Sequence, residues 1–160
     1  MIDVVITTDG SVSGNGKPTA TGGWACILQA FKRELAPSDS DTLQVLINEK
    51  ECSGKLVYET DSCPITNNRA EMYAILRGLE EVCGKNCRIE VHSDSELCIK
   101  TLNGEYSRKT NTDLWERLDK RCVELKNRGC SIMFMWVRGH NGHVLNERCD
   151  KLASKAKKAV

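Results

Sequence analysis

The hydrophobic pattern in the first third of the chain predicts three β-strands. Residues 2–8 are apolar or β-branched and lead into Asp9-Gly10-Ser11, a turn signal, so we expect a strand whose C-terminal end is Asp9. Residues 23–28 form a second apolar run within hairpin distance, and residues 54–60 indicate a third strand. The three runs together predict an antiparallel meander.

The segment between the second and third predicted strands carries a weak pattern. Residues 37–41 are loop-like, and residues 43–47 fit either a short strand or a helical turn. The pattern therefore assigns no definite element to 31–53.

The second half of the chain alternates between helical and strand patterns. Apolar side chains recur at helical spacing over 68–82, 94–102, 111–127 and after Asn146, which predicts four helices, the last of them capped by Asn146. Apolar runs at 87–92 and 132–137 predict two strands between these helices. Strands that alternate with helices pair in parallel, so the sequence predicts an α/β fold: a mixed five-stranded sheet, three antiparallel strands and then parallel strands, flanked by helices.

Composition narrows the class of protein. The 160 residues, 40% hydrophobic and 28% charged, fit one domain covering 1–160. No apolar run reaches the roughly 18 to 20 residues that span a bilayer, and the N-terminus does not resemble a signal peptide, so we expect a cytoplasmic monomer without membrane contact. Nine cysteines predict free thiols, and Cys83 and Cys87 lack a second ligand pair for zinc. A net charge of +1 restricts any nucleic-acid contact to a local surface.

Four acidic residues stand where solvation alone does not explain their charge. Asp9 and Asp94 follow the first and fourth predicted strands, which can be neighbours in a mixed sheet. Glu71 and Asp150 lie beside the inward faces of two predicted helices. Four converging carboxylates repel one another unless a cation holds them, and a pair of Mg²⁺ ions uses such oxygen ligands in phosphodiester hydrolysis. The cluster predicts a metal-dependent nuclease.

Each carboxylate also has a purely structural interpretation. Asp94 could cap the helix that follows it, and Glu71 lies at the capping-box distance from Asn68. Asp150 stands in the predicted first turn of its helix, where a negative charge is favourable, and Asp9 begins an ordinary turn sequence. Only their joint placement favours the metal site.

The motifs around these carboxylates resemble type 1 ribonuclease H, in family order and over nearly the whole chain. They are Asp9-Gly10-Ser11, Gly22-Gly23-Trp24-Ala25, Thr66-Asn67-Asn68-Arg69-Ala70-Glu71, Ser93-Asp94-Ser95, Asn111-Thr112-Asp113-Leu114-Trp115 and the segment from Trp136 to Asp150. The resemblance implies an endonuclease that cuts the RNA strand of RNA/DNA hybrids and leaves 3′-hydroxyl and 5′-phosphate ends. It also implies that Asp9, Glu71, Asp94 and Asp150 are catalytic and bind two Mg²⁺ ions, for which Mn²⁺ can substitute.

The resemblance assigns further roles. His140 matches the mobile histidine of the family, which is thought to assist proton transfer or product departure, and His143 is expected to make a structural hydrogen bond. Hybrid contacts are implied at Gly10, Ser11, Asn15, Thr66, Asn67, Asn68 and Glu96. Asn67 and Asn68 could also simply cap their helix.

Two departures from the family pattern keep a rival hypothesis open. Residues 104–110 stand where many members carry a long basic protrusion, so we expect weak or strongly salt-dependent hybrid binding. Glu96 replaces the usual glutamine and adds negative charge beside the substrate path. A hybrid-binding module without catalysis would fit these departures. Residues 31–53 also form a longer stretch than the second hairpin turn usual in the family, so the resemblance implies an atypical insertion there.

Two other enzyme classes are weaker alternatives. Transposases and junction resolvases share the fold, but they are not expected to combine the motifs at 66–69 and 139–143. A phosphatase that forms an aspartyl-phosphate on Asp9 would need a second aspartate at position 11, which holds Ser11.

Overall fold

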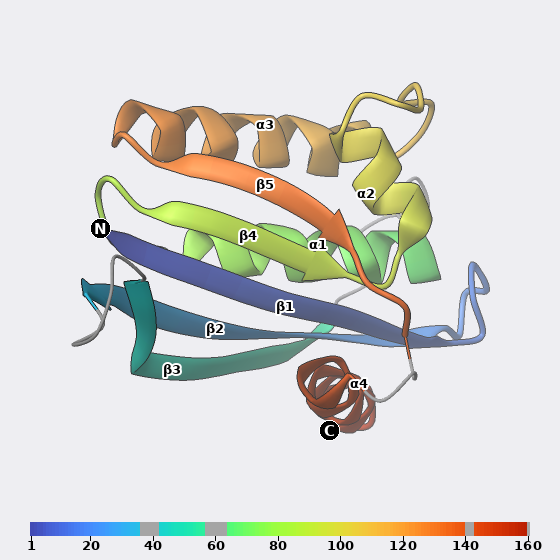
Figure 1. Cartoon of the computed structure of the whole chain (residues 1–160). Coiled ribbons are helices and arrows are strands. Elements are labelled where there is room, and N and C mark those ends of the chain that lie inside the picture. Colours follow the sequence, from blue (N-terminus) through green and yellow to red (C-terminus); the bar gives the residue numbers. More distant parts are fainter. Residues whose placement is uncertain (36–41, 57–63, 140–142, 160) are drawn as a thin grey trace.

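The computed structural model describes residues 1–35, 42–56, 64–139 and 143–159, and it shows a mixed sheet with helices on both faces (Figure 1). The strands are β1 (Ile2–Ser13), β2 (Thr21–Leu35), β3 (Thr42–Leu56), β4 (Arg88–Ser93) and β5 (Ser131–Trp136). They form one five-stranded sheet in the order β3-β2-β1-β4-β5. β1 to β3 pair antiparallel, whereas β4 pairs in parallel with both β1 and β5. The predicted fold class is confirmed.

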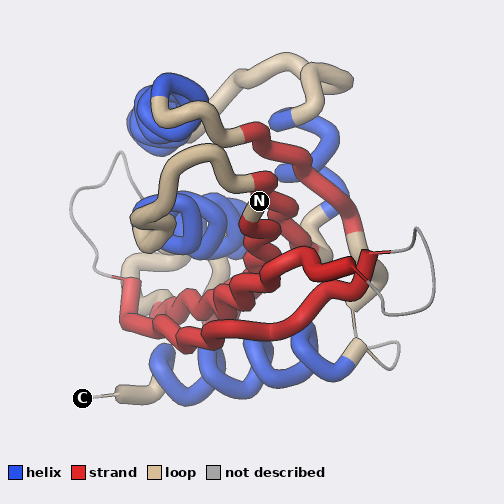
Figure 2. Tube along the Cα trace, turned by 60° about the vertical axis from the view of Figure 1, so that its left-hand side comes forward, coloured by secondary structure: helices blue, strands red, loops and turns tan. Residues whose placement is uncertain are grey.

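The helices divide between the two faces of the sheet. They are α1 (Asn67–Glu80), α2 (Glu96–Leu102), α3 (Thr112–Asn127) and α4 (Val144–Lys157). Figure 2 shows one helix, α4, on the opposite side of the sheet from α1 and α3. Over the described ranges, none of these helices is both long and apolar enough to cross a bilayer.

Each face of the sheet has its own apolar core. The larger core contains Ile6 of β1, Leu79 of α1 and Leu118 of α3, all fully buried. The smaller core lies under α4 and contains Ile27 and Cys149. α4 packs closely because Gly23 has no side chain: a Cβ atom there would collide with the carbonyl oxygen of Ala153. The sheet is therefore fixed from both sides.

β1 is longer than predicted. The expectation that it ends at Asp9 is wrong, because β1 continues to pair with β2 as far as Ser13. Its pairing with β4 does end at Thr8, opposite Ser93. Asp9 therefore lies inside β1, at the point where this strand loses its β4 neighbour. The chain turns later, at Gly14, whose φ of +72° favours glycine.

The segment 31–53 belongs to the hairpin of β2 and β3, and the interpretation of its length as an atypical insertion stays a prediction. Its described residues extend β2 and β3 into one long antiparallel hairpin, with an irregularity in register between Ala30 and Phe31. The predicted third strand begins at Thr42 rather than at residue 54, and residues 57–60 lie outside the described ranges. Leu43 and Ile47 are exposed, so this half of β3 lacks the alternation that marks a strand.

A buried carboxylate anchors the far half of this hairpin to β1. Asp3 accepts hydrogen bonds from Arg33 on β2 at 2.7 Å, Gln44 on β3 at 2.6 Å and Arg88 on β4 at 2.9 Å. Asp3 is only 6% exposed, so this buried carboxylate links side chains of four strands at the N-terminal end of β1.

The cysteines of the described ranges are free thiols, as the sequence predicted for the chain. All eight cysteines of the described ranges are unpaired, and Cys26, Cys87, Cys98, Cys130 and Cys149 are buried. Buried free cysteine behaves as a small apolar residue.

Candidate active site

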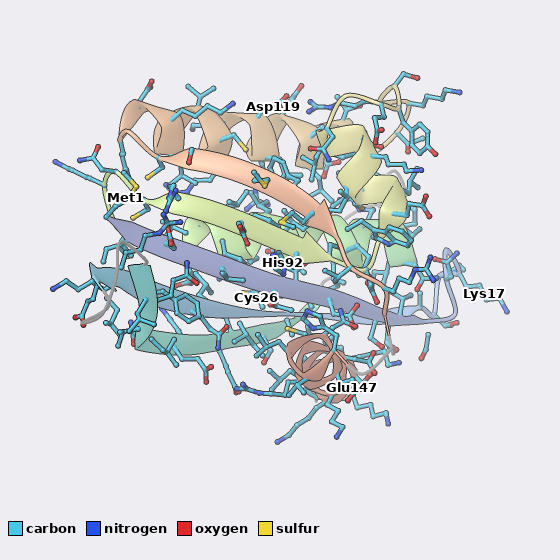
Figure 3. All side chains as sticks on the ribbon, in the orientation of Figure 1. Met1, Lys17, Cys26, His92, Asp119 and Glu147 are labelled. Atoms are coloured by element: carbon cyan, nitrogen blue, oxygen red, sulfur yellow. The ribbon has the colours of Figure 1, made fainter. Side chains whose placement is uncertain are left out.

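Three of the predicted carboxylates meet at one end of the sheet. Asp9 in β1, Asp94 directly after β4 and Glu71 in α1 offer oxygen atoms that all lie within 4.8 Å of one another. Parallel pairing of β1 with β4 brings Asp9 and Asp94 together, as the sequence predicted. This is the end of the sheet beside the β1–β2 turn, which Lys17 marks in Figure 3. Within the described residues, no other cluster of His, Cys, Asp and Glu has this geometry.

Two glycines allow the carboxylates to approach one another. A Cβ atom on Gly10 would lie 2.7 Å from the carbonyl carbon of Ala70 and 2.8 Å from the amide nitrogen of Glu71, so α1 can contact β1 only at a glycine. A Cβ atom on Gly139 would lie 2.6 Å from Oδ2 of Asp94. Gly10 was predicted as a hybrid contact, and the structure gives it this packing role as well. The role of Gly139 was not predicted, because sequence shows only a glycine in a loop.

Asp150 approaches from the opposite face of the sheet. It lies outside the group of three, yet its charge contributes to raising the pKa of Asp9. The interpretation of Asp150 as a first-turn residue is wrong, because α4 begins at Val144 and the acidic residue of its first turn is Glu147. Attraction to the helix N-terminus therefore does not explain the position of Asp150.

The capping alternatives for the other carboxylates also fail. Ser95, not Asp94, caps α2, because its hydroxyl accepts a hydrogen bond from the amide of Cys98 at 3.2 Å. Thr66 caps α1, because its hydroxyl accepts a hydrogen bond from the amide of Arg69 at 3.2 Å. Asn67 and Asn68 lie inside the first turn of α1, so neither is the capping residue and Glu71 has no capping-box partner there.

The buried carboxylates of the cluster repel one another, and either a bound cation or protonation would relieve this repulsion. Burial, and then the charge of Asp94, raise the pKa of Asp9 from its ordinary 3.8 to about 8. Burial, and then the charges of Asp9 and Asp94, raise the pKa of Glu71 well above its usual range. Within the described part of the chain, the buried Oε2 atom of Glu71 has no hydrogen-bond partner. A cluster of oxygen donors with an unsatisfied buried oxygen fits a hard divalent cation.

Polar groups next to the carboxylates are held in place by their neighbours. The side-chain oxygen of Asn15 accepts a hydrogen bond from the amide of Asn67 at 2.7 Å, which joins the β1–β2 turn to α1. The thiol of Cys98 donates to the side-chain oxygen of Asn68 at 3.1 Å. Asn67 is exposed and Asn68 is partly exposed. The side-chain amides of Asn67 and Asn68 are thus accessible to solvent beside the carboxylates.

The two remaining predicted contacts differ in their surroundings. The hydroxyl of Ser11 accepts a hydrogen bond from that of Ser154 at 3.3 Å, which links β1 to α4. Glu96 is exposed and pairs with Lys100 at 2.6 Å, one turn further along α2. The extra negative charge that the sequence led us to expect beside the substrate path therefore has a cationic partner.

Of the two histidines in the predicted loop, only His143 lies within the described residues. His140 lies outside the described residues, so its role stays a prediction. His143 caps α4, because its Nδ1 atom accepts a hydrogen bond from the amide of Asn146 at 3.0 Å. The structural role predicted for His143 is confirmed, and the prediction that Asn146 caps this helix is wrong.

Two contacts that hold the site were not predicted. The indole of Trp136 donates to the carbonyl oxygen of Asp94 at 3.2 Å, which ties the end of β5 to the residue after β4. The guanidinium of Arg69 donates to both oxygens of Asp113, at 2.9 and 2.8 Å. The motifs that contain these residues were recognised, but the sequence alone did not show which members of different motifs touch.

One family model and several curated proteins are similar to this chain over nearly its whole length. A family model described as RNase H matches residues 2–158. The curated protein "Ribonuclease H" of Phenylobacterium zucineum is 34% identical over 166 residues, covering 96% of this chain and 89% of that protein. "Ribonuclease H" of Lachnoclostridium phytofermentans is 35% identical, with 96% and 90% covered.

Solved structures show the same likeness. RNase H1 from the halophilic archaeon Halobacterium salinarum has a TM-score of 0.60 and 26% identity, with 96% of each chain covered. LC11-RNase H1, solved in complex with an RNA/DNA hybrid, has a TM-score of 0.63 and 21% identity over 96% of each chain. At 21% identity, the likeness to LC11-RNase H1 shows a similar fold.

Proposed function

The chain belongs to the RNase H family, and from this premise we propose that it is an endonuclease that hydrolyses the RNA strand of RNA/DNA hybrids with divalent metal ions. The observation that carries the proposal is the convergence of Asp9, Glu71 and Asp94 within 4.8 Å, from three separate elements. Such a group is costly to bury unless cations are bound, because each carboxylate opposes the ionisation of the others.

We assign Asp9, Glu71, Asp94 and Asp150 as the metal ligands. The proposed metal is Mg²⁺, with two ions bound, and Mn²⁺ is proposed to substitute for it. Bound ions of this kind polarise the scissile phosphate and lower the pKa of an attacking water. The protein's contribution is to hold the carboxylates apart from solvent at fixed positions: Gly10 and Gly139 give the required clearance, and Trp136 anchors the backbone of Asp94. The proposed products carry 3′-hydroxyl and 5′-phosphate ends.

The hybrid is proposed to lie across the N-terminal end of α1. The amides of Asn67 and Asn68 and the β1–β2 turn at Asn15 are accessible beside the carboxylates, where they can contact sugars and base edges in a wide minor groove. A 2′-hydroxyl bound here would distinguish the RNA strand from the DNA strand. Gly10, Ser11, Thr66 and Glu96 are proposed to contact the same hybrid. His140 is proposed to assist proton transfer or product departure.

The cellular setting is part of the proposal. The free thiols of the described cysteines fit a reducing compartment, so we place the reaction in the cytoplasm, carried out by a monomer.

The test compares labelled RNA/DNA hybrid, duplex RNA and duplex DNA as substrates, with Mg²⁺ or Mn²⁺ and over a range of salt concentrations. We expect cleavage only of the RNA strand in the hybrid, with a steep loss of activity at high salt. Asp94→Asn should abolish turnover and leave the circular dichroism spectrum unchanged. Hybrid binding without products in either metal would support the non-catalytic binding module instead.

A further inference from the structure

The N-terminal part of α1 is held between two neighbours, and one of them lies outside the cluster of carboxylates. On one side, it contacts β1 at Gly10, so closely that a Cβ atom on the glycine would lie 2.8 Å from the amide nitrogen of Glu71. On the other side, the side chain of Arg69 reaches the N-terminus of α3. Arg69 precedes Glu71 by two positions in α1, so a contact that fixes the backbone at Arg69 also restricts the backbone from which the Glu71 side chain extends.

The contact of Arg69 with α3 is a two-point ion pair with a third hydrogen bond. Its two terminal nitrogens donate to the two oxygens of Asp113 at 2.9 and 2.8 Å, and one of them also donates to the side-chain oxygen of Asn111 at 3.2 Å. The side chain of Arg69 is 10% exposed. A planar guanidinium that binds a carboxylate at two points fixes orientation as well as distance.

Asn111 adopts a conformation that serves this contact. It is the N-cap residue of α3, yet its φ of +60° lies in the left-handed region and its side chain makes no capping hydrogen bond to α3. A side chain that could have capped its own helix instead accepts a hydrogen bond from α1. Left-handed backbone at a non-glycine residue costs about 1 kcal/mol or more, so the surrounding contacts must hold it.

We propose that Arg69, through Asp113 and Asn111, is a positioning residue that sets Glu71 at the distance the metal site requires. The inference rests on the proposed function of the carboxylate cluster. It assigns the N-terminus of α3 a role in metal affinity, although α3 contributes no metal ligand. Residues that contact a metal ligand or its backbone, and not the metal itself, commonly fix the position of that ligand. Here the backbone between Arg69 and Glu71 would connect the ion pair to the metal ligand.

The chain offers a matched control for this ion pair. Arg117 of α3 and Glu80 of α1 form a second ion pair between the same two helices, at 3.3 Å and at the end of α1 remote from the carboxylates. Removing either pair weakens the contact between α1 and α3, but only the pair at Arg69 lies within two residues of Glu71. Asp113→Asn and Glu80→Gln are therefore compared, with Arg69→Lys as a milder variant that keeps the charge and loses the two-point geometry.

Two measurements decide the proposal. Calorimetric titration with Mg²⁺ should show about a tenfold loss of affinity for Asp113→Asn and a smaller loss for Arg69→Lys, since changes in the outer layer of a metal site typically cost 10- to 100-fold. Amide hydrogen exchange in EDTA should show faster exchange at the N-terminal end of α1 in both variants. Glu80→Gln should leave both quantities as in the wild type.

The outcomes separate this inference from the proposed function. Loss of thermal stability in Asp113→Asn with unchanged Mg²⁺ affinity and unchanged exchange would overturn it and leave a merely structural ion pair. If the wild type neither bound Mg²⁺ nor cut the hybrid, the proposed function would fail, and the exchange measurement would still show whether Arg69 fixes the N-terminal part of α1. If Asp113→Asn failed to fold, Arg69→Lys would provide the same comparison.

Discussion

Replacement of Asp9 by asparagine is expected to stabilise the metal-free protein while destroying the proposed activity. Asp9 is 2% exposed, and its pKa is raised from 3.8 to about 8 by burial and by Asp94. A carboxyl with a higher pKa in the folded state binds more protons when folded. Its contribution to stability is therefore lost as pH rises from about 4 towards about 8.

The size of the effect follows from these values. At pH 7, roughly three pH units above the ordinary pKa, keeping this group folded costs at most ~4 kcal/mol, at ~1.4 kcal/mol per unit. An asparagine amide of similar volume removes the charge but must still be desolvated, which costs ~1 to 2 kcal/mol. The expected net gain for Asp9→Asn in the absence of metal is therefore about 2 kcal/mol at pH 7. Near pH 4 the charge term vanishes, and the amide desolvation leaves a net loss of ~1 to 2 kcal/mol.

Urea unfolding in EDTA at pH 4, 7 and 8.5 measures this difference, with Glu116→Gln on the exposed side of α3 as the control. The control should change the free energy of unfolding by less than about 0.5 kcal/mol. Excess Mg²⁺ should stabilise the wild type and not Asp9→Asn, because only the wild type binds it well. An Asp9→Asn protein that is no more stable than the wild type at pH 8.5 in EDTA would refute the reasoning.

Three further predictions follow from close contacts and burial. Gly139→Ala places a methyl group against the Asp94 carboxylate, so kcat on the hybrid should fall about 10- to 100-fold with little change in thermal stability. Gly23→Ala forces α4 away from β2 and should lower the free energy of unfolding in urea by ~1 to 3 kcal/mol. A pulse of iodoacetamide at pH 8, read by mass spectrometry, should label the exposed Cys83 well before Cys98, whose pKa burial raises to about 12.

Each of these has a clear contrary result. Unchanged kcat in Gly139→Ala would show that the Asp94 carboxylate has room to move. An undiminished stability of Gly23→Ala would show that α4 can shift without loss. Equal labelling of Cys83 and Cys98 would mean that the N-terminal part of α2 opens on the timescale of the pulse.

The order of elements and the neighbours of β1 could be predicted because they depend on local patterns and on general rules of chain connection. Helical spacing identified α1 and α3, and alternation with strands required parallel pairing of β4. From this pairing alone, Asp9 and Asp94 could be placed together. The sequence was thus sufficient wherever one face of an element is buried and the other is not.

The features that escaped prediction depend on contacts between distant segments. The exposed half of β3 has no apolar face, so only pairing with β2 shows that it is a strand. The caps at Thr66, Ser95 and His143 each stand one to three residues from the residue predicted, because several polar residues adjoin each helix start and the backbone chooses among them. The clearance at Gly139 becomes visible only when Asp94 is placed against it.

The contacts of Asp3 with the long β2–β3 hairpin separate the end of this hairpin from the carboxylate cluster. Asp3 and Asp9 are six positions apart on β1, or about 20 Å along an extended strand. Lengthening or shortening the hairpin beyond Arg33 and Gln44 by two residues on each strand preserves which side chains face which side of the sheet. A reporter group attached to the described residues of the hairpin beyond Arg33 and Gln44 is therefore expected to leave the geometry of the carboxylates intact.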